Sequence, residues 1–186
     1  MKKLLLLILL LPLYVAASAQ EFHIGAEGSR FVSGDADMYW KGGVVGSYTI
    51  KLPKCFALDV NASLYYQHYD TSTHLERPGN KYPENKKHDY AQTFGGSIGV
   101  NGIIKLGGPI SFFTGPLATC NFFQKAYFYD TTMDMNIHRA MLQWRFGLQA
   151  DVSRLRIRAS WDVCATNCNQ WGDKGTAISV SVAYRL

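Results

Sequence analysis

The last eleven residues of this chain, 176–186, alternate strictly between two kinds of side chain. One parity is small or polar, and the other holds Ile178, Val180, Val182, Tyr184 and Leu186. Successive side chains of a β-strand point to opposite faces, so one face is wholly apolar, whereas a helical period would mix the two sets. A tilted strand crosses a bilayer in roughly 9–11 residues. The segment therefore predicts the closing strand of a transmembrane β-barrel.

The amino terminus has the three parts of a secretory signal. Two lysines precede an apolar run over 4–11, and residues 17–19 are the small-residue cleavage site Ala-Ser-Ala. A membrane anchor is the alternative, but the apolar run is too short and Pro12 interrupts it. The sequence thus predicts a signal peptide over 1–19 and a single barrel domain over 20–186.

Seven further segments alternate in the same way. The predicted strands span 22–30, 40–51, 56–67, 90–104, 110–123, 140–151, 155–163 and 176–186. The connections between them are alternately long and short, as an up-and-down membrane barrel with both termini on the periplasmic side requires. The predicted fold class is therefore all-β, an eight-stranded antiparallel up-and-down transmembrane β-barrel.

Two irregular points are expected in the middle of the chain. The tight turn at 107–109 would pair Leu106 with Ile110 on the apolar face. The Gly115-Pro116 pair interrupts the alternation of the next strand, and proline cannot donate to a ladder. We therefore expect a β-bulge at Pro116.

A turn at 152–153 would set the register of the seventh and eighth strands. It would pair Gln149 with Arg156 and Leu148 with Ile157, so that like side chains face like. In the same register Arg145 would face Ser160, and Arg158 would face Gly147. The small partner in each of the last two pairs would leave room for a guanidinium to cross the barrel.

Alternation alone does not separate a membrane barrel from a soluble, lipocalin-like one with the faces reversed. The membrane is favoured by an interfacial girdle of aromatic side chains near the strand ends: Phe22, Trp40, Phe56, Tyr66, Tyr90, Trp161 and Tyr184. The polar face carries arginines and carboxylates on neighbouring strands, which suits a narrow lumen. The apolar face is therefore expected to point outward into lipid.

Charged residues of the inward face form the main candidate site. An eight-stranded barrel is just wide enough for its own side chains, and a buried charge must be paired. We expect Glu27 and Asp59 to pair with Arg145 and Arg158, closing the lumen. The predicted network comprises Glu27, Asp59, Arg145, Arg156, Arg158 and Asp162, with Lys41 and Asp151 also inward. The alternative is that these charges line a hydrated channel.

Other residue types give weaker signals. The five histidines lack short ligand spacings, so no metal site, cofactor or catalytic residue is assigned. His68, Asp70 and Ser72 would suit an outer-rim hydrolase, but one strand and its loop do not set triad geometry. Cys164 and Cys168 share a predicted outer loop in an oxidising compartment, where a disulfide is plausible and two free thiols are the alternative.

The carboxyl-terminal segments, 161–167 and 175–186, resemble the small porin-like outer-membrane β-barrel family of Bacteroidota. Members often end in Tyr-Arg/Lys-Phe, whereas Leu186 ends this chain. The resemblance implies the eight-stranded fold and a place in the outer membrane of a Gram-negative bacterium. It implies no activity and no catalytic residues. Some relatives are accessory parts of protein-export complexes.

The charge balance and the long loops limit the functions that the sequence supports. Without the two signal lysines, 17 basic residues stand against 14 acidic ones and are scattered, which does not support nucleic-acid binding. The sequence favours a non-enzymatic structural or surface-interaction role, with outer-membrane lipid around the barrel and a protein or surface ligand on loops 70–88 and 124–138. The alternatives are a narrow porin-like channel and an export-complex component.

Overall fold

The structure is a computed structural model that describes residues 20–32, 40–70, 90–128, 131–134, 140–166 and 175–186. Their strands are β1 (Gln20–Phe31), β2 (Trp40–Lys51), β3 (Phe56–Asp70), β4 (Tyr90–Gly107), β5 (Ile110–Phe128), β6 (Thr131–Asp134), β7 (Ala140–Val152), β8 (Leu155–Cys164) and β9 (Thr176–Arg185). Within these ranges, no helix is long and apolar enough to cross a membrane.

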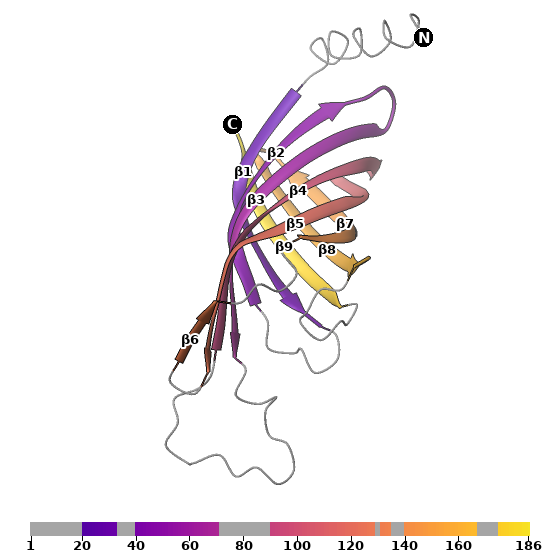
Figure 1. Ribbon diagram of the computed structural model, residues 1–186. Coiled ribbons are helices and arrows are strands. Elements are labelled where there is room, and N and C mark those ends of the chain that lie inside the picture. The colour runs from indigo at the N-terminus through magenta and orange to yellow at the C-terminus, as the bar shows by residue number, and fades with distance from the viewer. Residues whose placement is uncertain (1–19, 33–39, 71–89, 129–130, 135–139, 167–174) are drawn as a thin grey trace, which may run out of the picture.

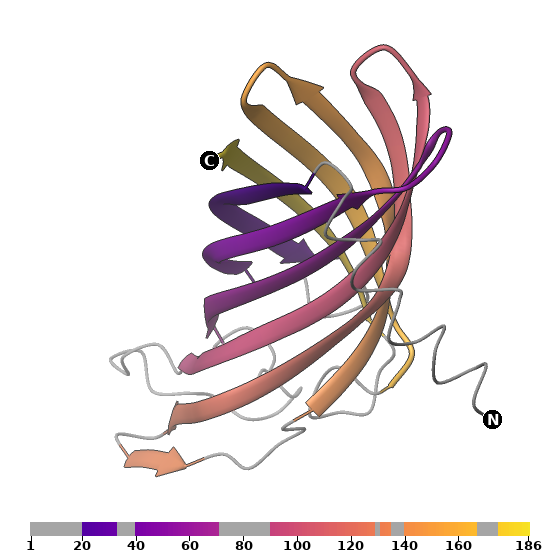
Figure 2. The same ribbon diagram turned by 90° about the horizontal axis from the view of Figure 1, so that it is seen from above.

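Eight of the strands form a closed antiparallel barrel, which confirms the predicted fold class. Each pairs with its neighbours in the order β1-β2-β3-β4-β5-β7-β8-β9, and β9 pairs back to β1. The short β6 pairs only with β5, outside this ring (Figure 1). The strands lie side by side and tilt in the same sense, as Figure 2 shows from above. Residues 1–19, the predicted signal peptide, lie outside the described residues.

The two ends of the barrel differ. The tight connections at 52–55, 108–109 and 153–154 lie at the same end as Gln20 and Leu186, because every neighbouring pair is antiparallel. We call this the turn end and the opposite one the loop end. Figure 1 shows the turn end at the top.

The stagger of the strands sets the width of the barrel. Following the paired residues once around, from Gln20 through Ile50, Leu58, Gly102, Thr114, Phe146, Trp161 and Ile178, returns to Arg30, ten residues further along β1. Ten residues of stagger over eight strands correspond to a tilt of about 40° at ordinary strand spacings. A barrel of this size has an interior that side chains can fill.

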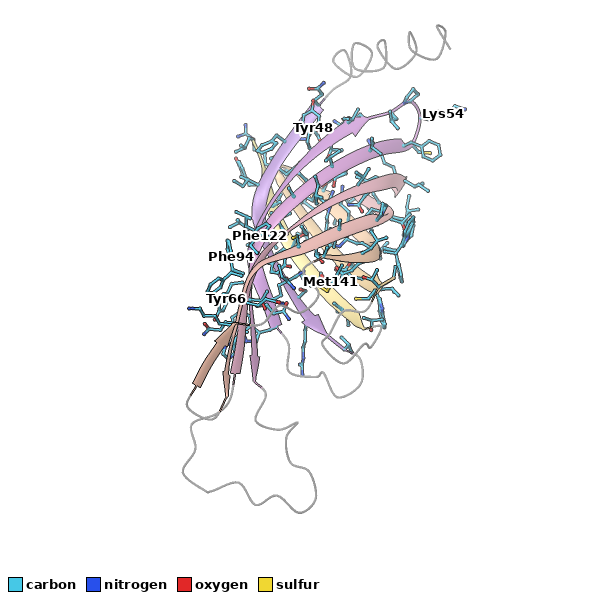
Figure 3. All side chains as sticks on the ribbon, in the orientation of Figure 1. Tyr48, Lys54, Tyr66, Phe94, Phe122 and Met141 are labelled. Atoms are coloured by element: carbon cyan, nitrogen blue, oxygen red, sulfur yellow. The ribbon has the colours of Figure 1, made fainter. Side chains whose placement is uncertain are left out.

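The barrel is apolar outside and polar inside. On the outer face Ile24 is 52% exposed and Val180 is 49% exposed, whereas Asp59 and Asp162 inside are 0% and 1% exposed. Exposed aromatic side chains occur toward both ends: Phe22, Trp40, Phe56, Tyr66, Trp161 and Tyr184. Figure 3 shows Tyr48 toward the turn end and Tyr66, Phe94 and Phe122 toward the loop end. The side chain of Tyr90 is not described.

Glycine allows the strands to coil tightly enough to close so small a ring. A Cβ on Gly115 would overlap the carbonyl oxygen of Val100, and one on Gly147 would overlap that of Ala159. Both glycines lie where a neighbouring strand backbone approaches too closely for any side chain. Such positions mark the sharp bends of a sheet that curls into a barrel.

The predicted turn at 152–153 is wrong by one residue. Val152 belongs to β7 and pairs with Leu155, so the two turn residues are Ser153 and Arg154. Ser153 has a φ of 58°, a left-handed conformation that two-residue hairpin turns require. Moving the turn by one residue moves every β7–β8 pair by two, so the faces are kept but the predicted partners are not.

The two irregularities expected in the middle of the chain also fall elsewhere. Gly107, not Leu106, pairs with Ile110, because Gly107 and Gly108 both have positive φ and the ladder shifts between Lys105 and Gly107. The bulge expected at Pro116 is wrong too. Pro116 pairs with Trp144 on β7.

The β4–β5 ladder shows why Pro116 makes no bulge. Near Pro116 the ladder lacks pairs between Gly99–Leu117 and Gly102–Thr114, and its register is the same on both sides of this gap. The proline therefore removes a hydrogen bond without adding a residue to the strand.

Candidate functional site

Arg145 on β7 organises the charges in the loop-end half of the lumen. Its Nε and Nη2 donate to the two Asp162 carboxylate oxygens on neighbouring β8, at 2.7 and 2.8 Å. Its Nη1 and Nη2 donate to Glu27 on β1, three strands away around the ring, at 3.0 and 3.2 Å. Ser179 and Ser160 also donate to Asp162, at 2.7 and 3.3 Å. One guanidinium thus joins three strands.

A second cation lies near this cluster. Lys41 on β2 is 8% exposed, and its ammonium sits 4.6 Å from the centre of the Tyr65 ring. The Tyr65 hydroxyl donates to Asn121 Oδ1 on β5 at 2.7 Å. Among the described side chains of this half of the lumen, the two cations Lys41 and Arg145 equal the two carboxylates Glu27 and Asp162 in number.

Arg158 on β8 spans the lumen in the turn-end half. Its Nη1 donates to Asp59 Oδ2 on β3 at 2.8 Å, and these two strands lie four positions apart in a ring of eight, directly opposite each other. Its Nε donates to Gln149 on β7 at 2.8 Å. The guanidinium also lies 5.2 Å from the centre of the Phe113 ring. The pair therefore crosses the full width of the barrel.

Arg156, two residues earlier on β8, supports the same carboxylate. Its Nη1 donates to Thr49 Oγ1 at 2.7 Å and lies 3.4 Å from Asp59 Oδ1, while Thr49 itself donates to Asp59 at 2.7 Å. Its Nε donates to Asp151 on β7 at 2.7 Å. Asp59 consequently accepts from two arginines and one hydroxyl, which compensates its complete burial.

Apolar side chains fill the lumen beside these charges. Ile103 on β4 and Phe113 on β5 are 2% and 1% exposed and pack with Ala57 in one cluster. Leu117, also on β5, is 1% exposed. Arginine ion pairs and packed apolar side chains thus both occupy the interior between the strands.

The structure divides the six predicted network residues into two groups of three. Glu27, Arg145 and Asp162 form one, and Asp59, Arg156 and Arg158 form the other. Glu27 contacts Arg145, and Asp59 contacts Arg158. The predicted cross-strand partners are wrong, because the shifted turn pairs Arg145 with Asp162, Arg158 with Gln149 and Arg156 with Asp151. The room for each guanidinium comes from the lumen, not from a small partner.

The predicted network names charged residues and leaves out several neutral partners. Thr49, Gln149 and Ser179 have the inward parity that alternation predicts, and each forms a hydrogen bond with a charged residue of the network. Alternation places a neutral side chain inside but does not indicate which charged group it contacts.

Glu21 was missed because the first strand was predicted to begin at residue 22. It lies at the turn-end opening, where its Oε1 accepts from Lys51 Nζ at 2.7 Å and from Arg185 Nη1 at 2.8 Å. The Lys51 and Arg185 side chains are 39% and 40% exposed, against 2% for Arg156 deeper in the lumen. This opening is thus a solvated continuation of the buried network.

The sheet continues past the rim at the loop end. The last β7 pair with β5 is Ala140 with Cys120, yet β5 runs on to Phe128, paired with β4 as far as Tyr90 and with the whole of β6. We call residues 90–93, 122–128 and 131–134 the loop-end extension; it hangs below the barrel in Figure 1. Residues 124–128 and 131–134 are therefore strand, which corrects the loop predicted over 124–138.

A β-bulge lies at the root of this extension. The β4–β5 register shifts between Phe94 and Gly95, so that Phe122 and Phe123 are both exposed, at 61% and 50%. Phe122 packs against Phe94 with ring centres 6.1 Å apart, and Lys125 lies 5.1 Å from the Phe123 ring. Bulges bend a strand and re-aim its side chains. The bulge switches the outward parity of β5, which ordinary alternation could not predict.

The other sequence candidates lie partly outside the described residues. Cys55 and Cys120 are free thiols, and Cys164 is disulfide-bonded and accepts from Gln143 Nε2 at 3.3 Å. Cys168 is not described, so its link to Cys164 stays a prediction. His68 packs against Trp40 with ring centres 6.1 Å apart, while Ser72 and most of loop 70–88 are not described. Within the described ranges, no group of three His, Cys, Asp or Glu side chains could hold a metal.

Comparison with known proteins reveals a fold but no family. A scan against family models and a search of curated proteins found no match. The crystal structure of Ail, the attachment invasion locus protein of Yersinia pestis, is similar, with a TM-score of 0.54 and 12% identity over 91% of this chain and 99% of that one.

Two other structures of Ail are also similar. Its complex with the heparin analogue sucrose octasulfate has a TM-score of 0.51 and 12% identity, over 90% of this chain and 97% of that one. The outer membrane protein Ail in a phospholipid bilayer nanodisc has a TM-score of 0.47 and 13% identity, over 90% and 100%. At this identity the likeness shows the fold alone: this chain folds as a small eight-stranded barrel of the outer-membrane type.

Proposed function

We propose that this protein is a non-enzymatic outer-membrane barrel that anchors a rigid sheet at the cell surface, where the sheet binds a partner. The observation that carries the proposal is the loop-end extension, in which β4, β5 and β6 stay hydrogen-bonded beyond the barrel rim. Backbone hydrogen bonds hold such a sheet in one conformation, unlike an open loop. The sheet can therefore bind a partner without losing the conformational entropy that a flexible loop would lose.

Orientation follows from the two ends. Short turns face the periplasm and long connections face outward in barrels of this type. We therefore place the turn end, with both chain termini, in the periplasm, and the loop-end extension outside the cell. A signal peptide over 1–19 would deliver the chain, and the small porin-like family of Bacteroidota is the proposed source family.

The lumen supports anchoring rather than transport. Arg158 and Asp59 cross the full width of the barrel, and Arg145 joins β7 to β1 in the other half. A pore would need to break at least one buried ion pair, which is strongly destabilising when one partner is lost. Ail, the similar barrel, was crystallised with a heparin analogue, so sulfated polysaccharide is a reasonable first ligand to try.

Adhesion of whole cells tests the proposal. Cells that display the protein are added to plates coated with heparin, collagen or lipopolysaccharide. One variant replaces 124–138 by a short glycine turn, and a matched control shortens 33–39 instead. Both are first shown to form heat-modifiable barrels on detergent gels. We expect wild-type and control cells to adhere to one of the coatings and the first variant to lose adhesion. Wild-type adhesion no greater than that of cells lacking the protein would contradict the proposal.

A further inference from the structure

The turn-end opening contains a cavity with more positive than negative charge. Its volume is about 190 Å³, and its charged lining comprises Lys51, Lys105, Arg156 and Arg185 against Glu21 and Asp151. These four cations come from β2, β4, β8 and β9, so four strands converge on one space. The cavity lies at the opposite end from the loop-end extension and plays no part in the proposed surface binding.

The acids of the cavity are already occupied. Glu21 accepts from both Lys51 and Arg185, and Asp151 accepts from Arg156 at 2.7 Å and from Gln149 at 2.7 Å. Two positive charges therefore remain uncompensated within the lining. Arg156 is 2% exposed and cannot move away from the cavity into solvent.

Two further lining groups remain available as donors. Lys105, exposed at the rim, makes no ion pair with any described residue, and Ser111 is 5% exposed with no hydrogen-bond partner for its hydroxyl in the described part of the chain. A lysine ammonium and a hydroxyl can both donate to one oxyanion.

We propose that this cavity is a binding site for a small oxyanion of phosphate or sulfate size, entering from the turn end. Lys105 and Ser111 donate to it, and the excess positive charge of Lys51 and Arg185 around Glu21 attracts it. A volume of about 190 Å³ leaves room for such an ion and several waters of ~30 Å³ each. The bound ion links β4 and β5 to the charged strands across the opening.

Calorimetric titration tests the site on the refolded barrel, residues 20–186, in nanodiscs of neutral lipid. Inorganic phosphate and sulfate are titrated at constant ionic strength, with chloride as the reference. We expect saturable phosphate or sulfate binding and no chloride binding. The midpoint of thermal unfolding should rise as the bound ion stabilises the folded state.

Variants that spare every ion pair of the network locate the site. Lys105→Gln and Ser111→Ala should each weaken binding by about threefold to fivefold, the scale of one exposed charge or hydrogen bond. Lys54→Gln, in the β2–β3 turn and outside the cavity lining, should leave binding unchanged. Since none of the three breaks a described ion pair, all should fold, which the heat-modifiable gel shift verifies.

Three outcomes would overturn the site: no saturable binding, binding that chloride reproduces at equal ionic strength, or binding that both cavity variants leave unchanged. A last titration repeats the phosphate measurement in nanodiscs that contain phosphatidylglycerol. If they remove the binding of free phosphate, lipid headgroups occupy the cavity and the ligand is a lipid phosphate rather than a free ion. Unchanged binding in those nanodiscs supports the free ion.

Discussion

The Arg145 cluster and the turn-end opening use the same residue types in different surroundings. In the first, the side chains of Arg145, Glu27 and Asp162 are 7%, 8% and 1% exposed. In the second, Lys51 and Arg185 are about 40% exposed around a single carboxylate. The nitrogen–oxygen distances of the ion pairs are alike, near 2.7 to 3.0 Å in both clusters. Burial, not geometry, distinguishes them.

This difference decides what each cluster can do. A buried pair costs several kcal/mol of desolvation per ion, so removing one partner leaves a charge that nothing compensates. A solvated pair gains little and loses little, and salt screens it. The Arg145 cluster is thus suited to hold strands together and close the lumen, and the opening is suited to exchange its contacts for those of a ligand.

Replacing Arg145 should give the largest effect. In Arg145→Met, Glu27 and Asp162 stay buried without their guanidinium, and the free energy of unfolding should fall by about 3–5 kcal/mol. Urea unfolding of the refolded barrel, followed by the compact gel band, measures the change. Arg154→Met is the control, because that exposed side chain donates to the Tyr184 hydroxyl and to no other group in the described part of the chain. Equal midpoints for the two variants would show that the cluster does not hold the barrel together.

Replacing Asp59 should give the next largest effect. Asp59→Asn keeps a hydrogen-bond acceptor but removes the charge that faces Arg156 and Arg158, so a loss of about 2–3 kcal/mol is expected. A double-mutant cycle with Arg158→Gln should give a coupling of about 1–3 kcal/mol. Simple additivity of the two substitutions would rule out the cross-lumen contact as a stabilising pair.

Replacing Glu21 should give the smallest effect. Glu21→Gln frees Lys51 and Arg185 into solvent, so a loss of at most about 1 kcal/mol is expected, and most of it should vanish in molar salt. Unfolding curves at low and high salt measure both quantities. A large loss that salt does not reduce would mean that the opening is buried in solution, and the comparison would fail.

The alternation of side chains correctly predicted which residues point into the barrel, because this depends only on the two-residue repeat of a strand. Arg145, Arg158 and Asp59 could be placed inside because a strand has only two faces, and a register error of two residues leaves a face unchanged. The partners depend on where a turn begins. The turn begins at Ser153, whose backbone has a left-handed φ, and the alternation of side chains does not indicate this conformation.

The loop-end extension was the least predictable region. A bulge at Phe122 and Phe123 changes which side chains of β5 point outward. The strand β6 lies in a polar segment without alternation, and it pairs with β5. The bulge depends on the pairing of Phe94 and Gly95 with distant residues of β5, to which local patterning is blind, whereas β6 folds back on β5 as a tight hairpin. Ring packing of Phe122 on Phe94 stabilises the bulged form only once the strands have met.

Conductance in planar bilayers tests the closed lumen most directly. With Arg145 and Arg158 joined to carboxylates on other strands, the wild-type barrel should carry no steady current, and Arg145→Ala combined with Arg158→Ala should raise leakage. Refolding of both proteins is checked by their heat-modifiable migration. A stable open-channel current in the wild type, unchanged by the two substitutions, would contradict the closed lumen and identify a pore.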